Sequence, residues 1–346
     1  MQTMKGLAVD KQGKLSIAEL DIPEINEYQA LVKTVACGIC NGTDAKLIHN
    51  NFKLFDSYPA ILGHEGVGEV VKIGAKVTTF KVGDRVLLPF LMTENRGYYP
   101  GWGGFAEYGV VGDAAAMEAD KISPIPEGHY AQSVIPTDMD PVRAVMVVTF
   151  REVLSAIRRF DLRAGQPILV YGAGPVGLCF ISFCKLLGLS PIIAVEIDDA
   201  KLAEAKRLGA DVTLNGAEVD VAAEVKKIFP DGIENIVDAA GVNALINQAM
   251  QMVKYNGKIC VYGISARTSM ELDWSLAPYN WSLNFVQWPS KIEEGEAHEQ
   301  VLAWLASGEI CFDDYISDIL PFAEIIPAYE SLLSGISKKK TIICFP

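Results

Sequence analysis

The sequence has no apolar run long enough to cross a membrane, since runs such as residues 144–150 are far shorter than a spanning helix. Basic residues are the scarcer charged class, 30 against 43 acidic residues, which gives a formal net charge of −13. Such an acidic surface argues against nucleic acid or an anionic membrane as the main partner. The residues after Met1 include neither the basic segment nor the apolar stretch of a secretory signal.

The cysteine spacing of a disulfide framework is also missing. The seven cysteines are an odd number and are spread along 346 residues, unlike the closely spaced cysteines of a small secreted domain. Their distribution predicts a reducing cytoplasm, with thiols that are free or bound to a metal ion. Half of the residues are hydrophobic, so the chain is long enough and apolar enough for two domains, each with its own core.

Two successive patterns predict an α/β protein with two kinds of domain. Short strands punctuated by glycines come first, at residues 31–36, 66–71 and 83–88, and they are typical of an all-β, barrel-like unit. From about residue 144 the pattern changes and apolar strands alternate with helices, which predicts a parallel, doubly wound sheet. The Pro-rich segment 113–141 is expected to be irregular. The strands expected in the second part are 167–171, 192–197, 233–238 and 258–263, and the helices 175–188, 199–208 and 297–307.

A glycine-rich turn follows the strand expected at residues 167–171. It has the form G-x-G-x-x-G and opens a helix, which is the context that dinucleotide binding requires. The first glycine makes the turn, the second lets the backbone approach a pyrophosphate, and the third lets helix and strand pack closely. Free N–H groups at the start of the helix then face the phosphates. The residues predicted to bind the cofactor are Gly172, Gly174, Pro175, Val176 and Gly177.

Glu196 ends the strand that follows this helix, and it predicts NAD rather than NADP as the cofactor. A carboxylate at this place can accept hydrogen bonds from both ribose hydroxyls of NAD, and it would repel a 2′-phosphate. The next residues, Ile197 and Asp198, supply no arginine for that phosphate.

A second set of motifs indicates a metal site. Cys37 and Cys40 form a C-x-x-C pair, but the chain has no second pair that could complete a structural zinc site. His64 and Glu65 follow in the sequence Gly-His-Glu. One thiolate, one imidazole and a nearby carboxylate, with a position left open, fit a catalytic zinc better than a structural one.

These motifs together resemble the signature of the zinc-containing medium-chain dehydrogenases, the alcohol dehydrogenase family. The run 63–70 with Gly83-Asp84-Arg85-Val86 resembles the zinc signature of that family, and residues 37–44 resemble its Cys-Gly-Ile-Cys-x-Thr-Asp motif. The resemblance covers essentially the whole chain. It implies a GroES-like catalytic β-barrel domain at 1–149, a Rossmann NAD-binding domain at 150–286, and a C-terminal return to the catalytic domain at 287–346.

The resemblance also implies roles for particular residues. Cys40 and His64 would be zinc ligands, and Cys37 a packing residue. Thr43 would take the proton of the substrate, although Asn41-Gly42-Thr43 has one residue more than the usual spacing. A histidine often relays that proton to solvent in the family; here Lys46 holds roughly that place and His49 lies one helical turn later, so the relay stays open.

The third zinc ligand is the main departure from the family pattern. It should fall near residues 147–148, where both residues are valines, so Glu65 and Glu152 are the remaining carboxylates. Sorbitol-dehydrogenase-like members can use the glutamate of Gly-His-Glu directly, which favours Glu65 and leaves Glu152 as the alternative. Residues 86–105 contain no cysteine or histidine, so the second, structural zinc of many relatives is not expected and the prediction is one zinc per chain.

The function implied by the resemblance is hydride transfer between NAD and a secondary alcohol, giving a ketone. The carboxylate-rich metal site favours the sorbitol-dehydrogenase-like branch, hence a polyol or sugar alcohol as substrate. The expected assembly is a homodimer or homotetramer. Two alternatives stay open: a zinc-free quinone or enoyl reductase of the same superfamily, and a non-catalytic nucleotide-binding protein. His298 is expected to be solvated, and the run Lys338-Lys339-Lys340 is expected to form an exposed face, with neutralisation of the cofactor phosphates by one of these lysines as the alternative.

Overall fold

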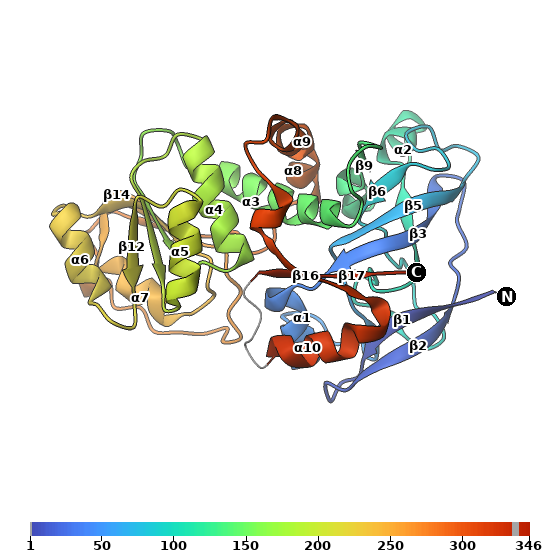
Figure 1. Cartoon of the computed structure of the whole chain (residues 1–346), viewed down its shortest axis with the longest axis horizontal. Helices are drawn as coiled ribbons and strands as arrows, with labels where there is room; N and C mark the ends of the chain where they lie inside the picture. Colours follow the sequence, from blue (N-terminus) through green and yellow to red (C-terminus); the bar gives the residue numbers. More distant parts are fainter. Residues whose placement is uncertain (1, 334–338) are drawn as a thin grey trace. The chain divides into compact units, whose positions relative to one another are not determined.

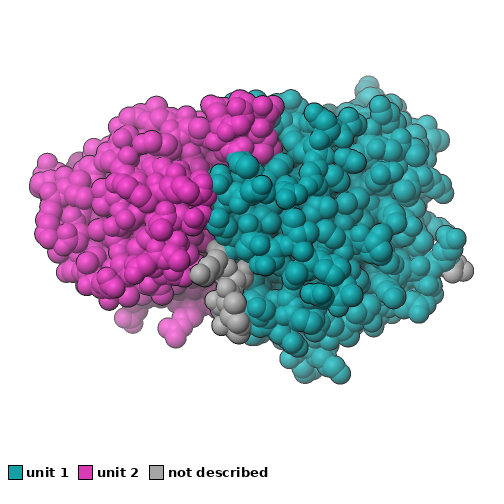
Figure 2. Space-filling view, viewed as in Figure 1, with its two compact units in different colours: residues 1–151, 290–303, 311–346 teal, residues 152–289, 304–310 magenta. Residues whose placement is uncertain are grey.

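The computed structural model describes residues 2–333 and 339–346, and the chain forms two compact units (Figure 2). The first unit contains residues 1–151, 290–303 and 311–346, and the second contains residues 152–289 and 304–310. The two units divide within α3 (Met146–Arg159), the helix in which the expected boundary between residues 149 and 150 also lies.

Two β-sheets form most of the first unit. The larger sheet has the strand order β16-β17-β3-β5-β6-β9, with β8 paired to β3, and the smaller has the order β2-β1-β4-β7. Figure 1 shows the C-terminal strands β16 and β17 beside β3, which comes from the start of the chain. The strands of the first unit are β1 (Thr3–Val9), β2 (Leu15–Asp21), β3 (Gln29–Gly38), β4 (Ala60–Ile61), β5 (Gly66–Ile73), β6 (Arg85–Leu87), β7 (Tyr99–Pro100), β8 (Tyr108–Gly112), β9 (Val134–Ile135), β16 (Ile316–Pro321) and β17 (Lys340–Cys344).

The helices of this unit are short and several have recognisable caps. Asp113 caps α2 by accepting a hydrogen bond from the backbone N–H of Ala116, and Ser290 caps α8 by accepting one from Ile292. Such caps satisfy N–H groups that the helix itself leaves free. The helices are α1 (Asn41–Ile48), α2 (Ala114–Ala119), α8 (Lys291–Glu296), α9 (His298–Ser307, shared between the units) and α10 (Ile325–Leu333), with 3₁₀ turns at Glu127–Ala131, Arg143–Val145, Phe312–Asp314 and Phe322–Glu324.

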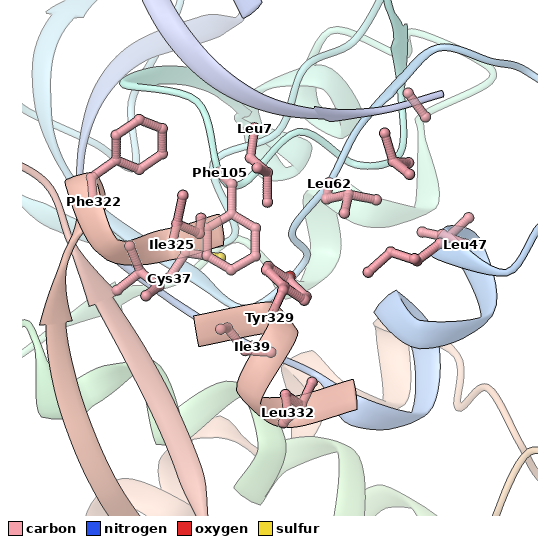
Figure 3. Packing of buried hydrophobic residues seen from close by; sticks show 14 residues of the cluster. Leu7, Cys37, Ile39, Leu47, Leu62, Phe105, Phe322, Ile325, Tyr329 and Leu332 are labelled. Atoms are coloured by element: carbon pink, nitrogen blue, oxygen red, sulfur yellow. The ribbon is translucent and has the colours of Figure 1, made fainter. Parts of the chain in front are cut away.

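An apolar cluster joins the two ends of the chain within the first unit (Figure 3). Helix α10 contributes Ile325, Tyr329 and Leu332, whose spacing of four and three residues places them on one face. This face packs with residues from the N-terminal half, among them Leu62 and Phe105. Burial of each large side chain stabilises the fold by roughly 1.5–3 kcal/mol. The cluster therefore holds the C-terminal helix against the N-terminal strands.

The second unit is built on a six-stranded sheet with the order β12-β11-β10-β13-β14-β15, and every pairing in it is parallel. Its central strands are apolar and buried, as expected where helices cover both faces of a sheet. The predicted α/β class, with a β-rich first unit and a doubly wound parallel sheet in the second, is confirmed. The elements are β10 (Ile168–Tyr171), β11 (Ile192–Glu196), β12 (Val212–Asn215), β13 (Ile233–Asp238), β14 (Val253–Val261), β15 (Ser282–Phe285), α4 (Pro175–Leu186), α5 (Asp199–Arg207), α6 (Val221–Ile228), α7 (Ala244–Met250) and a 3₁₀ turn at Trp274–Leu276.

The structure differs from the sequence-based expectation in a few elements. The segment 113–141 contains helix α2, a 3₁₀ turn and strand β9, although its prolines indicated irregular structure. The strand expected at residues 258–263 corresponds to β14, which begins five residues earlier, at Val253. Gly257 does not precede this strand but lies within it. None of the helices in the described part of the chain is long and apolar enough to cross a membrane.

Candidate metal and nucleotide sites

Three potential metal ligands meet within the first unit. Cys40, His64 and Glu65 offer a sulfur, an imidazole nitrogen and a carboxylate oxygen, and these atoms lie within 4.8 Å of one another. Cys40 follows β3 and is the N-cap residue of α1, while His64 and Glu65 come just before β5. The antiparallel pairing of β3 with β5 brings the ends of these segments together, and no other group of three such residues occurs among residues 2–333 and 339–346.

The His64 ring lies close to two carboxylates, one near each ring nitrogen. Its Nδ1 lies 3.6 Å from Oδ1 of Asp44, and its Nε2 lies 4.0 Å from Oε1 of Glu65. Nε2 is therefore the nitrogen that faces Glu65. A metal-binding histidine commonly directs its second ring nitrogen at a carboxylate in this way. The Trp102 ring lies beside the imidazole, with 5.4 Å between the ring centroids.

The electrostatic surroundings of His64 favour a cation. Burial by itself would lower the pKa of the imidazole, but the Cys40 thiolate and the Asp44 carboxylate raise this pKa well above its usual value. The same negative charges would attract a metal ion. Cys37 behaves differently, because its complete burial raises the pKa of the thiol well above normal, and a neutral buried thiol is a packing group.

Asp44 connects this group of potential ligands to the rest of the first unit. Its side chain is fully buried, and Oδ2 accepts hydrogen bonds from the backbone N–H of Cys40 (2.9 Å) and from the hydroxyl of Tyr329 (2.7 Å). The first bond spans only the start of α1. The second bond joins α1 to α10 across 285 residues of sequence.

Glu65 forms a buried ion pair with Lys340. The ammonium Nζ lies 2.7 Å from each carboxylate oxygen, and both side chains are almost completely buried. The pair packs against Gly38, where an added Cβ would lie 2.5 Å from Oε2 of Glu65. The two charges can be buried together because each compensates the other, whereas burying one of them alone would cost several kcal/mol.

The nucleotide motif in the second unit has open space where a pyrophosphate would bind. Gly174 is the N-cap residue of α4, Pro175 occupies the first turn, and an added Cβ on Gly174 would meet no atom within 4 Å. At Gly177, by contrast, an added Cβ would lie 1.9 Å from the carbonyl oxygen of Gly172, so only glycine fits. The loop thus has one glycine for close packing and another that leaves the helix N-terminus accessible to an anion.

The Glu196 carboxylate turns toward this loop. It ends β11 and accepts hydrogen bonds from the backbone N–H of Ala173 (2.9 Å) and of Ile197 (2.8 Å). A carboxylate has about four lone-pair sites, so it can accept further hydrogen bonds. The nucleotide loop and the acidic residue are therefore held together before any cofactor binds.

Comparison with known proteins gives the family. The description "Alcohol dehydrogenase GroES-like domain" matches residues 26–126, and "Zinc-binding dehydrogenase" matches residues 175–284. An alcohol dehydrogenase of Geobacillus stearothermophilus is 32% identical over an alignment of 282 residues that covers 75% of this chain and 77% of the relative. The chain belongs to the zinc-type medium-chain dehydrogenase family. The resemblance inferred from the motifs is thus confirmed, and the protein is a dehydrogenase.

Two further comparisons describe the range of this dehydrogenase's relatives. A sorbitol dehydrogenase of Bacillus subtilis is 29% identical over 286 residues, covering 79% of this chain and 78% of the relative. A crystal structure of 2R,3R-butanediol dehydrogenase from Bacillus subtilis shares the fold, with a TM-score of 0.81, 23% identity and 99% coverage of each chain.

The remaining site predictions concern helices α1 and α3. Thr43 is buried in the first turn of α1, near Cys40. Lys46 donates a hydrogen bond to the carbonyl of Gly42 (2.7 Å), and His49 is exposed at the end of α1. Glu152 is half-buried in α3 and is not a member of the three-residue group.

Two expectations from the sequence were wrong. Lys340 is buried beside Glu65 instead of being solvated with the rest of the lysine run, in which Lys338 lies outside the described residues. His298 is also buried, and its Nε2 hydrogen-bonds the carbonyl of Val134. Burial, with a smaller contribution from the positive charge of Arg151, lowers the pKa of His298 to about 4, so this ring is neutral.

Three residues that lie at or near the three potential ligands were given no role there by the sequence: Asp44, Tyr329 and Lys340. Asp44 was part of a quoted motif, so its place near the ligands was visible but not its hydrogen bonds. Tyr329 and Lys340 gave no local signal, because their partners lie 285 and 275 residues away in the chain.

Removal of the Lys340 charge should expose the cost of an unpaired buried carboxylate. In metal-free protein Lys340→Met should lower the free energy of unfolding by about 3–5 kcal/mol, because Glu65 loses its counter-charge. Added zinc should restore part of this loss. The measurement is urea unfolding with and without zinc.

Lys227→Met is the matched control, since Lys227 pairs with Glu224 on an exposed face. This substitution should change stability far less. Equal losses in the two variants would show that the buried pair has no special importance.

Proposed function

We propose that the protein is a zinc-dependent, NAD-using dehydrogenase that oxidises a secondary alcohol, a polyol or sugar alcohol, to a ketone. The observation that carries this proposal is the meeting of Cys40, His64 and Glu65 within 4.8 Å. Thiolate, imidazole and carboxylate are the ligand types of catalytic zinc sites with one open position. A zinc-free quinone or enoyl reductase would have no need of this group.

Cys40, His64 and Glu65 would hold the metal ion. Bound zinc supplies a Lewis acid, which lowers the pKa of an alcohol hydroxyl. Cys40 and Glu65 contribute negative charge, and Asp44 faces the Nδ1 side of His64 and so favours binding through Nε2. Lys340 balances the charge of Glu65 in the buried site.

Glu65 is proposed as the third ligand in preference to Glu152. It belongs to the three-residue group, while Glu152 does not. Its carboxylate can serve Lys340 and a metal ion together, because two oxygens provide about four lone-pair sites. Its attachment to Lys340 would also limit the directions in which those oxygens point.

Thr43 is proposed to take the proton of the substrate hydroxyl. It lies in the first turn of α1, near Cys40, and its side chain is buried. A hydroxyl can donate and accept at once, so it can pass a proton on without becoming charged. Lys46 and His49, further along α1, remain the candidates for relaying that proton to solvent.

The cofactor is proposed to be NAD, which accepts the hydride in this chemistry. The pyrophosphate would lie at Gly174, Pro175 and Val176, where the start of α4 is open. Gly172 and Gly177 shape the turn. Glu196 would accept the ribose hydroxyls and would repel the 2′-phosphate of NADP.

A polyol or diol is the proposed substrate class. The names of two relatives, a sorbitol dehydrogenase and a 2R,3R-butanediol dehydrogenase, include such compounds. A homodimer or homotetramer is the proposed assembly. The proposed location is a reducing cytoplasm, with which the seven free thiols are compatible.

The proposed function is tested by a panel of polyols and primary alcohols, assayed by NADH absorbance with zinc present. Polyols with secondary hydroxyls should be oxidised with the higher kcat/KM, and the product should be a ketone. Turnover of quinones or enoyl compounds without zinc would favour the reductase alternative. A chain that binds NAD but oxidises no alcohol would favour a non-catalytic role.

Metal content tests the ligand assignment. Element analysis should give close to one zinc per chain, and Cys40→Ser and His64→Ala should abolish both zinc binding and turnover. Glu65→Gln should weaken zinc retention, whereas Glu152→Gln should not. Cys311→Ser changes an exposed thiol and is the control that should retain zinc. Full zinc and activity in Glu65→Gln would exclude Glu65 as a ligand, and a value near two would require a second site.

Cofactor preference tests the role of Glu196. Combining Glu196→Ala with Ile197→Arg should raise the ratio of kcat/KM for NADP to that for NAD by about tenfold or more, because juxtaposed like charges cost several kcal/mol. Glu196→Gln is the matched variant, since it keeps an acceptor oxygen for Ala173 without the charge. Equal use of NAD and NADP by the unmodified protein would contradict this role.

A further inference from the structure

A hydroxyl from the C-terminal helix reaches the region of the three ligand residues. The Tyr329 hydroxyl on α10 donates a hydrogen bond to Oδ2 of Asp44, at 2.7 Å, and both side chains are fully buried. We propose that Tyr329 is a positioning residue of the metal centre, which fixes the Asp44 carboxylate so that Asp44 in turn orients Cys40 and His64. This role rests on the proposed zinc function and adds a residue outside the ligand set.

The hydrogen bonds of Asp44 explain how Tyr329 would fix the orientation of its carboxylate. Two donors, the backbone N–H of Cys40 and the Tyr329 hydroxyl, bind the same oxygen, Oδ2. The other oxygen, Oδ1, has no donor at bonding distance among residues 2–333 and 339–346, and Nδ1 of His64 faces it at 3.6 Å. Two donors on one oxygen keep the carboxylate from rotating, so the second oxygen remains directed at the imidazole.

Packing alone does not explain a tyrosine at this position. Tyr329 lies in the apolar cluster of Figure 3, beside Phe105, with the two rings 6.0 Å apart in an edge-to-face arrangement. A phenylalanine would fill the same space without placing a polar atom in the cluster. Burial, together with the charge of Asp44, raises the pKa of Tyr329 well above its usual value, so the hydroxyl keeps its proton and remains a donor.

Removal of the hydroxyl isolates its contribution. Tyr329→Phe leaves the ring in place and takes one of two donors from Oδ2, so Asp44 can rotate and its hold on Cys40 and His64 loosens. Loss of a residue that bonds directly to a metal ligand typically weakens metal binding about 10–100-fold. Tyr329 acts one contact further away, and the expected increase in the zinc dissociation constant is about three- to tenfold.

The matched control is Tyr58→Phe. The Tyr58 hydroxyl donates a hydrogen bond of the same length, 2.7 Å, to the carbonyl of Leu47, which is also in α1. Tyr58 packs against the same apolar cluster but does not bond to Asp44. Loss of the Tyr58 hydroxyl should lower the stability of the fold about as much as loss of the Tyr329 hydroxyl does. It should leave the zinc dissociation constant unchanged.

Two measurements on the full chain decide between positioning and packing. Competition with a chromophoric chelator gives the zinc dissociation constant, and visible absorption of the cobalt(II)-loaded protein reports the ligand geometry. Weaker zinc binding and altered cobalt bands in Tyr329→Phe, both absent in Tyr58→Phe, are the expected result. Unchanged binding and bands in Tyr329→Phe, or equal changes in the two variants, would overturn the proposal. Failure of the unmodified protein to bind either metal would overturn the zinc function, and this role with it.

A double-mutant comparison tests whether the effect passes through Asp44. In an Asp44→Ala background the Tyr329 hydroxyl has lost its partner, so adding Tyr329→Phe should weaken zinc binding no further. An additional loss as large as in the unmodified background would show that Tyr329 acts by another route and would overturn the proposal.

Discussion

The metal region depends on compensating two buried carboxylates. Glu65 and Asp44 are both almost completely removed from solvent, and a buried charge without a partner is costly. Each has its partner on the C-terminal segment: Lys340 on β17 binds Glu65, and Tyr329 on α10 binds Asp44. The proposed ligand residues and Asp44 come from the first 65 residues of the chain, but Lys340 and Tyr329, which compensate the two buried carboxylates, come from its end.

This dependence explains why the C-terminal segment joins the first unit. Strand β17 pairs with β3 in a register that places Ile343 opposite Cys37, and the N–H of Ile39 donates to the carbonyl of Thr341. The start of β17, where Lys340 lies, is thereby brought to the end of β3, just before Cys40. The apolar face of α10 then holds Tyr329 against α1. Sheet pairing, apolar packing and charge compensation thus all hold the C-terminal segment against the N-terminal part of the first unit.

The nucleotide loop and the group of potential metal ligands could be partly predicted from the sequence, because each depends on a short motif or on strands that pair directly. Gly177 must be glycine because the carbonyl of Gly172, five residues before it, leaves no room for a side chain. The side chain of Glu196 has to reach only the neighbouring loop. Cys40 and the pair His64-Glu65 follow and precede strands that pair directly, so their motifs were sufficient to suggest a site.

The sequence by itself determined the α/β class and the nucleotide turn, since each follows from short-range spacing. It also gave Cys40 and His64 as candidate metal ligands, but it left the third ligand open between Glu65 and Glu152. Only the tertiary structure decided the partners of those residues. Lys340 looked like part of an exposed basic run, and no sequence pattern singled out Tyr329. Their roles come from contacts across 275 and 285 residues. No local pattern specifies such contacts, because strand register and core packing, settled over the whole first unit, decide which distant side chains meet.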